Sequence, residues 1–201
     1  RFSQIRPSAE YEDLFEARLR GQPRSARYNI APTQEAWVVT PERDLMAMRF
    51  GLVPSWSTDN KFAAKLINAR AETLHEKPSF RPLIQHRRCL IPADGFFEWR
   101  REGSKKVPVR ILHKDSRPWV FAGLYDIWQN SYSFTIITCE PNSCMREIHD
   151  RMPVILDSRE ETTWLRGKLP EALELLVPCP SEKMTSYPVS TAVNRAGYVS
   201  P

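Results

Sequence analysis

The chain has 201 residues, 41% of them hydrophobic and 26% charged, which is ordinary for one globular domain with a core of its own. Its net charge is +5, with a pI near 9.1, so a partner that carries negative charge is favoured. No apolar run is long enough to cross a membrane, so we expect no membrane span. No signal-peptide pattern opens the sequence as it stands, but its first residue is Arg and not an initiator Met.

The cysteines indicate a reduced protein. They are scattered, without a C-x-x-C pair, at Cys89, Cys139, Cys144 and Cys179. This usage predicts a protein of the cytoplasm, associated with the nucleoid if it is bacterial. Cys139, Cys144 and His149 match no common zinc spacing, so we expect no metal and no other cofactor.

The positive charge is concentrated in the middle of the chain. Residues 61–117 carry 14 Lys or Arg against 6 Asp or Glu, whereas the remainder carries 15 against 18. Arginine makes up 21 of the 29 basic residues, and its planar fork binds phosphate and stacks on flat rings. Interleaved with six Trp and nine Phe, this charge favours a groove for single-stranded nucleic acid. A solvated basic face explains the same charge equally well.

The first third of the chain predicts a helix and then a hairpin. Residues 8–20 have helical periodicity, with Ser8 as the N-terminal cap and Gly21 ending the helix. Residues 36–40 and 45–50 look like the two strands of a hairpin, joined by a turn at residues 41–44. A short helix is predicted over residues 78–85.

Strands dominate the rest of the chain. Five consecutive strands are predicted at residues 88–92, 96–101, 107–113, 119–124 and 132–138, and their close spacing favours antiparallel pairing. Further elements are predicted in chain order: a helix at 142–148, a strand reaching Leu156, a helix capped by Ser158 and Glu161, a helix at 170–176 and a strand at 184–190. The chain is therefore predicted to be α+β, one domain over 1–201, with a mostly antiparallel, barrel-like sheet and short peripheral helices.

Residues 92–100 contain a carboxylate in an unusual setting. Asp94 and Gly95 form a turn pair, and an aromatic run with strand preference follows. In a strand, Phe96 and Glu98 share one face, while Phe97 and Trp99 share the other. If the Glu98 face is buried, desolvation raises the pKa of Glu98 toward neutrality and fits it for proton transfer. The alternative is an ordinary edge strand with Glu98 in water.

Four stretches, in this order, resemble the SOS response-associated peptidase family, a domain that also occurs in a eukaryotic hydroxymethylcytosine-binding protein. They are Arg1-Phe2, Leu66-Ile67-Asn68-Ala69-Arg70-Ala71-Glu72-Thr73, Ala93-Asp94-Gly95-Phe96-Phe97-Glu98-Trp99 and Ile148-His149-Asp150-Arg151-Met152-Pro153. The run Arg27-Tyr28-Asn29-Ile30-Ala31-Pro32 and Trp56 fit as well. The resemblance covers nearly the whole chain; each motif alone is weak, but all of them in order are strong.

The resemblance implies a specific chemistry. Family members shield abasic sites in single-stranded DNA by bonding to them through a cysteine that becomes N-terminal when the initiator Met is removed by self-processing. Met-Cys-Gly directly precedes the family's Arg-Phe, so the cysteine lies outside this numbering, which begins at Arg1. Its α-amine, with an ordinary pKa of about 7.7–8.0, forms an imine with the sugar aldehyde. The thiolate of the same residue then closes a thiazolidine ring. This ring is more durable than the imine, whose β-elimination would nick the strand in a weak lyase-like reaction.

The resemblance also implies roles for named residues. Glu98 is the acid/base, His149 moves protons at the sugar, and Asn68 holds the N-terminal residue or the sugar by its amide. The phosphate-binding residues are Arg1, Arg70 and Arg151, and the base-stacking residues are Trp56 and Trp99. The alternatives are a structural His149, a turn-forming Asn68, surface salt bridges for the arginines and a core position for Trp99.

The expected partner is single-stranded DNA that contains abasic sites. We expect the protein to be a monomer and not to associate with a membrane. Two other functions remain open. One is a non-catalytic single-stranded nucleic-acid-binding module, in which Glu98 and His149 are structural. The other is a thiol peptidase acting on other proteins, although no Ser-His-Asp or paired Cys-His arrangement is evident.

Overall fold

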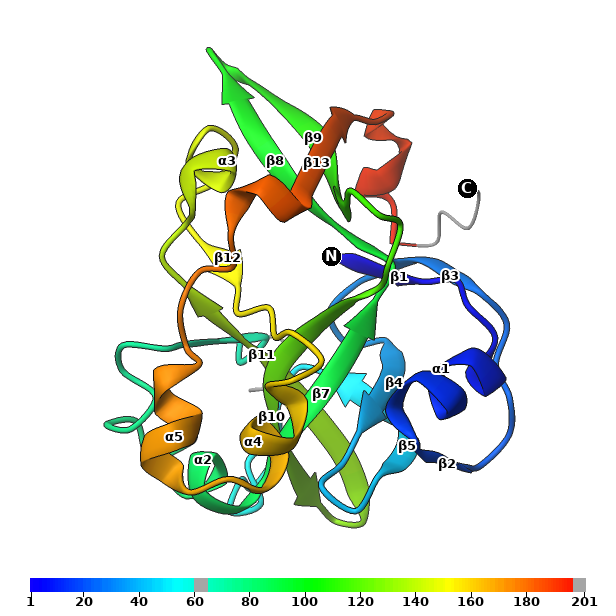
Figure 1. The fold of residues 1–201 in the computed structure, drawn as a ribbon, viewed down its shortest axis with the longest axis vertical. Helices are drawn as coiled ribbons and strands as arrows, with labels where there is room; N and C mark the ends of the chain where they lie inside the picture. Colours follow the sequence, from blue (N-terminus) through cyan, green and yellow to red (C-terminus); the bar gives the residue numbers. More distant parts are fainter. Residues whose placement is uncertain (60–64, 197–201) are drawn as a thin grey trace.

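The computed structural model describes residues 1–59 and 65–196, and its core is a closed β-barrel (Figure 1). The barrel order is β11-β10-β7-β4-β5, closed by a parallel pairing of β5 with β11. Its strands are β4 (Glu35–Val39), β5 (Asp44–Phe50), β7 (Arg88–Ala93), β10 (Trp119–Trp128) and β11 (Ser131–Cys139). Closure leaves this sheet without free edges along the ring. The predicted barrel-like sheet is therefore confirmed.

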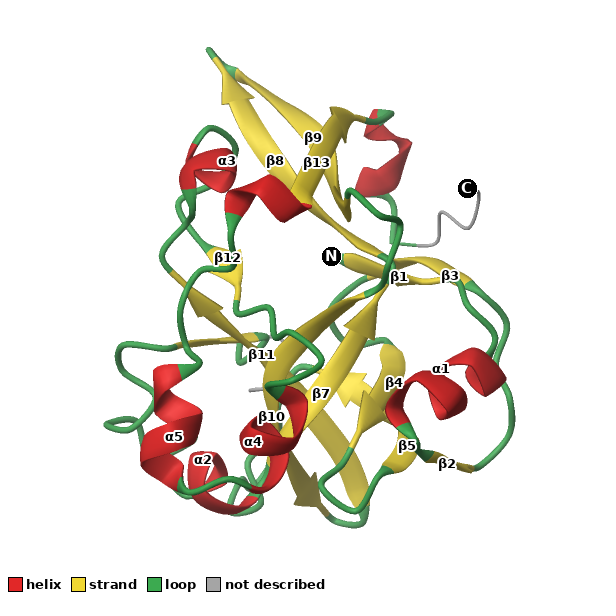
Figure 2. Cartoon of the chain, viewed as in Figure 1, coloured by secondary structure: helices red, strands yellow, loops and turns green. Residues whose placement is uncertain are grey.

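A second sheet leans away from one end of the barrel and carries the N-terminal strand in its interior. Its order is β13-β9-β8-β1-β3, with every pairing antiparallel. The strands are β1 (Phe2–Gln4), β3 (Arg27–Ile30), β8 (Gly95–Glu102), β9 (Lys105–His113) and β13 (Met184–Pro188). Figure 2 shows the β8–β9 hairpin projecting from the body of the molecule, with β13 beside it.

Short strands and helices complete the fold around these sheets (Figure 2). The strands β2 (Arg18–Arg20), β6 (Asn68–Arg70) and β12 (Met152–Pro153) attach to barrel strands. The helices are α1 (Ser8–Phe15), α2 (Leu83–His86), α3 (Ser143–Arg146), α4 (Glu161–Arg166) and α5 (Leu169–Glu174), with 3-10 turns η1 (Ser181–Lys183) and η2 (Thr191–Asn194). Across residues 1–59 and 65–196, no helix is long and apolar enough to cross a membrane.

A cluster of phenylalanines joins the two sheets. The Phe2 ring lies edge-on to Phe50 and Phe121, at centroid distances of 5.5 and 6.2 Å, and Phe96 lies edge-on to Phe121 at 5.7 Å. Phe50 stacks on Phe134 at 5.2 Å. All five rings are buried, and such pairs add about 0.5–1.5 kcal/mol each beyond their burial. The cluster therefore fixes β1 and β8 against the barrel.

The predicted hairpin and the five central strands are confirmed, with end shifts of a few residues, whereas the helix predicted over 8–20 is confirmed only for Ser8–Phe15 and is wrong beyond it. Helix α1 ends at Phe15, because Glu16 adopts the left-handed conformation (φ 47°, ψ 42°) and the Ala17 N–H bonds back to the Glu12 carbonyl. The chain then forms β2, which pairs in parallel with β5. Pro7, not Ser8, precedes the first turn, and it makes no side-chain cap.

Smaller differences have local causes. Helix α2 occupies only the end of the range predicted from residue 78. The capping box from Ser158 is not formed, because the Glu160 carboxylate accepts the Asp157 N–H at 2.8 Å and α4 begins at Glu161. Parallel pairings of β11 with β5 and β6 interrupt the otherwise antiparallel pattern.

The position of β1 depends on two buried polar side chains. The Gln4 amide donates to the Trp37 and Pro92 carbonyls at 2.9 and 2.8 Å, and its oxygen accepts the Trp37 N–H at 2.7 Å. Asp94 accepts the Ile5 N–H at 2.6 Å, and its own N–H donates to the Ser3 carbonyl at 2.8 Å. These contacts join β1 to the barrel strands β4 and β7.

Asp94 also ties down the start of the following helix. Its carboxylate accepts hydrogen bonds from the Arg6 Nε and the Tyr11 hydroxyl, both at 2.7 Å. The predicted turn pair thus joins β7 to β8, and both oxygens of the buried Asp94 carboxylate accept hydrogen bonds. A buried acceptor of this kind costs several kcal/mol to remove, because its donors lose their partner.

We predict that Asp94→Ala lowers the free energy of unfolding by about 2–4 kcal/mol, because the Tyr11 hydroxyl and the Ile5 N–H lose their acceptor. Glu10→Ala is the matched control, since it removes the exposed partner of the same arginine and costs less than about 1 kcal/mol. Urea unfolding followed by fluorescence measures both. Equal stability of the two variants would contradict a structural role for Asp94.

Candidate functional site

A cavity of about 610 Å³ lies where β1, β6, β8, β11 and β12 meet, next to the phenylalanine cluster. It contains seven of the eight site residues predicted from the sequence: Arg1, Asn68, Arg70, Glu98, Trp99, His149 and Arg151. These residues come from four separate stretches of the chain. The fold therefore brings the motifs together, although their individual roles stay predictions.

The backbone of Arg1 enters this cavity beside Glu98. The strand pairing sets Phe2 opposite Phe96, and the Phe97 N–H donates to the Arg1 carbonyl at 2.8 Å. Burial lowers the pKa of the Arg1 α-amine, and the nearby Glu98 charge opposes that shift. A buried amine with a lowered pKa is neutral, and therefore nucleophilic, at lower pH than an exposed one.

The Arg1 side chain points to the C-terminal turn η2. Its guanidinium donates to the carbonyls of Val193 and Asn194 and lies 5.7 Å from the centre of the Trp99 ring. The Trp99 indole N–H donates to the Asn194 side chain at 2.8 Å. Trp99 is thus half-buried and lines the cavity, its indole hydrogen-bonded to η2, and it is not a core residue.

Glu98 and His149 face each other across the cavity. The Glu98 carboxylate oxygen lies 3.8 Å from the His149 Nε2. Burial raises the pKa of Glu98, while the charges of the α-amine and of His149 oppose the rise and that of Asp150 adds to it. The alternation in residues 96–100 does not produce one buried face, because Phe96 and Phe97 are both buried and the Glu98 side chain is 24% exposed. Its partly buried, raised-pKa carboxyl is nevertheless suited to proton transfer.

The orientation of His149 is set by its own backbone neighbourhood. Its Nδ1 accepts the Arg151 N–H at 3.1 Å and lies 3.2 Å from a carboxylate oxygen of Asp150. Nδ1 lies equally close, at 3.1 Å, to the Arg151 carbonyl oxygen, so both a donor and acceptors surround it, and Nε2 is the nitrogen that faces Glu98. The pair can therefore exchange a proton with a group bound between them.

The Arg151 guanidinium is held by a carboxylate within the chain. It forms two parallel bonds with Glu72, at 2.8 and 2.9 Å, and a third to the Thr138 carbonyl at 2.6 Å. The hydrogen bond from Arg151 holds the pKa of Glu72 below its usual range. The sequence did not single out Glu72 as a partner, because 79 residues separate the two. Its position in the motif with Asn68 and Arg70 was the available signal.

Asn68 and Arg70 lie at the mouth of the cavity on β6. They are exposed, and Ala69 between them is buried, as alternation along a strand requires. Lys65 also lines the cavity, and sequence reasoning missed it although it adjoins the motif. Trp56 is 60% exposed and is absent from the described residues that line the cavity, so the structure does not bring it to this site.

A second hollow, of about 760 Å³, adjoins the first and shares Glu98, Trp99 and His149 with it. Its further lining includes three basic side chains, Arg101, Lys106 and Arg146, and three acidic ones, Glu140, Glu147 and Asp150. The two hollows together form a continuous site with Glu98 and His149 near its middle and basic residues on both sides.

The internal cysteines lie outside this site. Burial raises the pKa of the Cys89 thiol, that of Cys139 to about 11 and that of Cys179 to about 12, so these thiols are weak nucleophiles. None of the four cysteines lines either hollow among the described residues. The same part of the chain contains no His, Cys, Asp and Glu group that fits a metal ion.

Known proteins resemble this chain along most of its length. The family described as SOS response associated peptidase matches residues 1–196. "Abasic site processing protein YoaM" of Bacillus subtilis is 46% identical over 83% of this chain and 79% of the relative. "Abasic site processing protein YedK" of Escherichia coli is 34% identical over 83% and 78%. "Abasic site processing protein HMCES" of Xenopus tropicalis is 38% identical over 77% of this chain and 55% of the relative.

Solved structures share the fold. A crystal structure of a protein from Bacteroides thetaiotaomicron has a TM-score of 0.76 and 35% identity, covering 80% of this chain and 75% of that one. A protein from Bordetella bronchiseptica has a TM-score of 0.80 at 23% identity over 94% and 98%, which shows likeness of fold alone. With the motif residues gathered in one cavity and the match over residues 1–196, the chain belongs to the SOS response-associated peptidase family.

Proposed function

We propose that this protein binds single-stranded DNA and captures abasic sites covalently through the N-terminal residue of its mature form. The relatives are named abasic site processing proteins, which supports the same target here. The observation that carries the proposal is the position of Arg1, whose backbone nitrogen is buried beside Glu98 at the cavity shared with His149.

The mechanism needs a thiol and a free α-amine on one residue, so it requires a cysteine ahead of Arg1. Two residues, Cys-Gly, span at most about 7 Å, which keeps such a cysteine within reach of the cavity. The amine attacks the sugar aldehyde and releases water, giving an imine. The thiolate then adds to the same carbon and the nitrogen takes up a proton, which closes a five-membered ring.

Glu98 and His149 divide the proton transfers of this reaction. Glu98 takes a proton from the attacking amine and returns it to the departing hydroxyl, for which a raised pKa is an advantage. His149, whose Nε2 faces Glu98, exchanges a proton with the sugar hydroxyl during ring opening. Asn68 at the mouth holds the sugar or the N-terminal residue through its amide.

Basic residues on both sides of Glu98 hold the phosphates that flank the lesion. Arg70 and Lys65 serve one side, and Arg101, Lys106 and Arg146 serve the other. Arg151 contributes charge near the lesion while Glu72 fixes its orientation. Trp99 offers its ring to a neighbouring base. In this proposal the same site also removes the initiator Met, because that cleavage exposes the reactive amine of the cysteine next to Glu98 and His149.

We predict that single-stranded DNA binding weakens steeply with salt and that Arg70→Gln lowers the slope of log K against log salt by about 0.7, the value for one phosphate contact on a single strand. Arg81→Gln, an exposed arginine outside both hollows, is the control and leaves the slope unchanged. Fluorescence anisotropy across a salt series measures both. Affinity that does not vary with salt would sink the proposed DNA track.

We predict that Glu98→Gln, in protein carrying Cys-Gly ahead of Arg1, slows capture of an abasic oligonucleotide by about 10²–10⁴-fold and leaves DNA affinity unchanged, because Gln keeps the shape and cannot exchange a proton. The unmutated rate rises with pH through the raised pKa of Glu98, since a base acts only when deprotonated. That pH dependence disappears in Glu98→Gln.

The control for this experiment is Glu140→Gln, an exposed carboxylate in the adjoining hollow. Single-turnover rates on denaturing gels give the comparison. If Glu98→Gln captures DNA as fast as this control, Glu98 is structural and the protein is better described as a non-catalytic nucleic-acid-binding module.

A further inference from the structure

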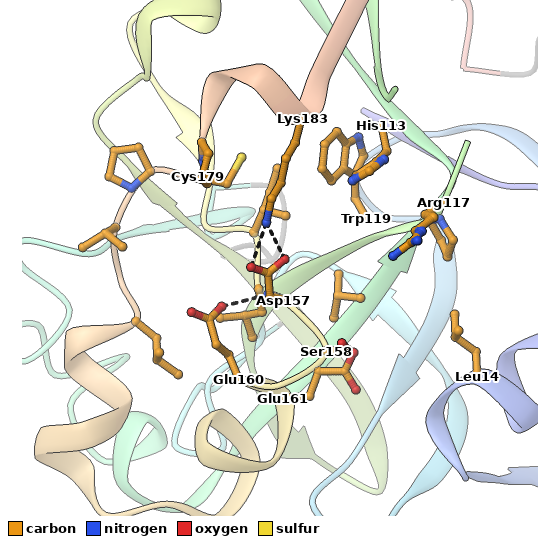
Figure 3. A pocket seen from close by; sticks show the side chains of 18 residues that line it. Leu14, His113, Arg117, Trp119, Asp157, Ser158, Glu160, Glu161, Cys179 and Lys183 are labelled. Carbon is orange, nitrogen blue, oxygen red and sulfur yellow. Dashed lines mark hydrogen bonds and ion pairs between the residues drawn. The ribbon is translucent and has the colours of Figure 1, made fainter. Parts of the chain in front are cut away.

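A separate cavity of about 500 Å³ lies between β10, the segment that follows β12, and the helices α1 and α4 (Figure 3). Among the described residues, none lines both this cavity and the Glu98 site. Neighbours on β10 face the two sites in turn: Val120 lines this cavity and Phe121 lines the other. The cavity is therefore a distinct site that the proposed DNA chemistry does not use.

A buried carboxylate without a hydrogen bond belongs to the lining of this cavity. Glu161, the first residue of α4, is 8% exposed, and no hydrogen bond to its carboxylate is present within residues 1–59 and 65–196. Its ion-pair partner in those residues is Arg43, at 3.8 Å. The Arg43 nitrogens instead donate to the Phe15 carbonyl and the Thr162 hydroxyl, both at 3.0 Å.

Such a carboxylate lacks the compensation that a buried charge needs. Burial raises the pKa of Glu161 to about 7, although the positive charge of Arg43 opposes the shift. Buried charges are normally paired and hydrogen-bonded, and a donor reaching the carboxylate through the cavity supplies both. Because the ion pair with Arg43 is too long for a hydrogen bond, the carboxylate has unused acceptor capacity, which suits a ligand group with N–H donors.

The other walls suit an apolar body of limited size. Trp119, Leu156 and Leu175 line the cavity, and Leu14 and Val177 at its edge remain 51% and 56% exposed. Large hydrophobic side chains with this much exposure are uncommon in the described part of the chain. The volume falls within the range of small-ligand pockets, about 300–1,000 Å³.

The balance of charge favours a cation over an anion. Lys183 and Asp157 form a two-bond ion pair, at 2.7 and 2.8 Å, and neutralise each other (Figure 3). With His113 counted as neutral, the remaining charged lining is Glu160 and Glu161 against Arg117, a balance of −1; Arg43, the ion-pair partner of Glu161, is not among the lining residues.

We propose that this cavity binds a small organic cation, in which an ammonium or guanidinium group bonds to Glu161 and a compact apolar body packs against Leu156, Val177 and Trp119. A free amine and the lysine or arginine side chain of a peptide offer this same chemistry. Binding here is independent of abasic-site capture.

Isothermal titration calorimetry with the full chain tests this with a charge series. The probes are phenethylamine, the neutral phenethyl alcohol and the anionic 3-phenylpropionate, which share one apolar body. We expect a dissociation constant below about 1 mM for the amine, at least ten-fold weaker binding of the alcohol and none of the anion. The blocked dipeptide acetyl-Phe-Lys-amide forms a second arm, so binding of only one arm identifies the source of the cation.

Glu161→Gln should weaken amine binding at least ten-fold, while Glu160→Gln, a neighbouring carboxylate whose bond to the Asp157 N–H a Gln oxygen can replace, should not change it. Val177→Ser, at an exposed position that folding tolerates, should weaken binding of every probe that binds. Single-stranded DNA affinity of Glu161→Gln should stay unchanged, which separates this site from the proposed function. Equal binding of amine and alcohol, retained binding in Glu161→Gln, or no binding in either arm would overturn the proposal.

Discussion

The site depends on the threading of β1 between β3 and β8. A three-residue strand has few hydrogen bonds of its own, so its place is fixed by neighbours: the Gln4 amide on β4 and β7, the Asp94 carboxylate, and the Phe2 ring in the aromatic cluster. These constraints direct the backbone of Arg1 into the cavity beside Glu98. Arg1 is thereby held as part of the wall of the candidate site.

Burial also tunes the candidate acid/base. Desolvation raises the pKa of Glu98, which favours its neutral form, while the charge of His149 opposes the rise. In the proposed reaction the attacking amine belongs to a cysteine two residues ahead of Arg1, and a carboxyl of raised pKa within its reach is suited to the proton transfers of attack on an aldehyde.

The local patterns predicted the strands well, and long-range pairings explain most of what they missed. Turn residues between closely spaced apolar runs located the strands, and β7, β10 and β11 are buried on both faces for most of their length. The parallel closure of β5 on β11 joins residues about 85 positions apart, and the helical periodicity of residues 8–20 failed where β2 pairs with β5. Seven of the eight site residues predicted from the sequence line the cavity. Three features depend on tertiary contacts that no local pattern encodes. They are the Glu72–Arg151 ion pair, the hydrogen bonds of Arg1 and Trp99 to η2, and the absence of Trp56 from the described lining of the cavity.

The central claim is that capture occurs at the N-terminal residue, in the cavity of Glu98 and His149. The most direct measurement is the intact mass, under denaturing conditions, of protein mixed with an oligonucleotide that contains one abasic site. We expect a 1:1 adduct, lighter by one water than the sum of its parts, for protein with Cys-Gly ahead of Arg1. We expect almost none for the Ser-Gly form or for protein starting at Arg1, because a hydroxyl or a lone amine does not close the ring. An equally abundant, reductant-independent adduct in protein starting at Arg1 would place the nucleophile elsewhere and contradict the account.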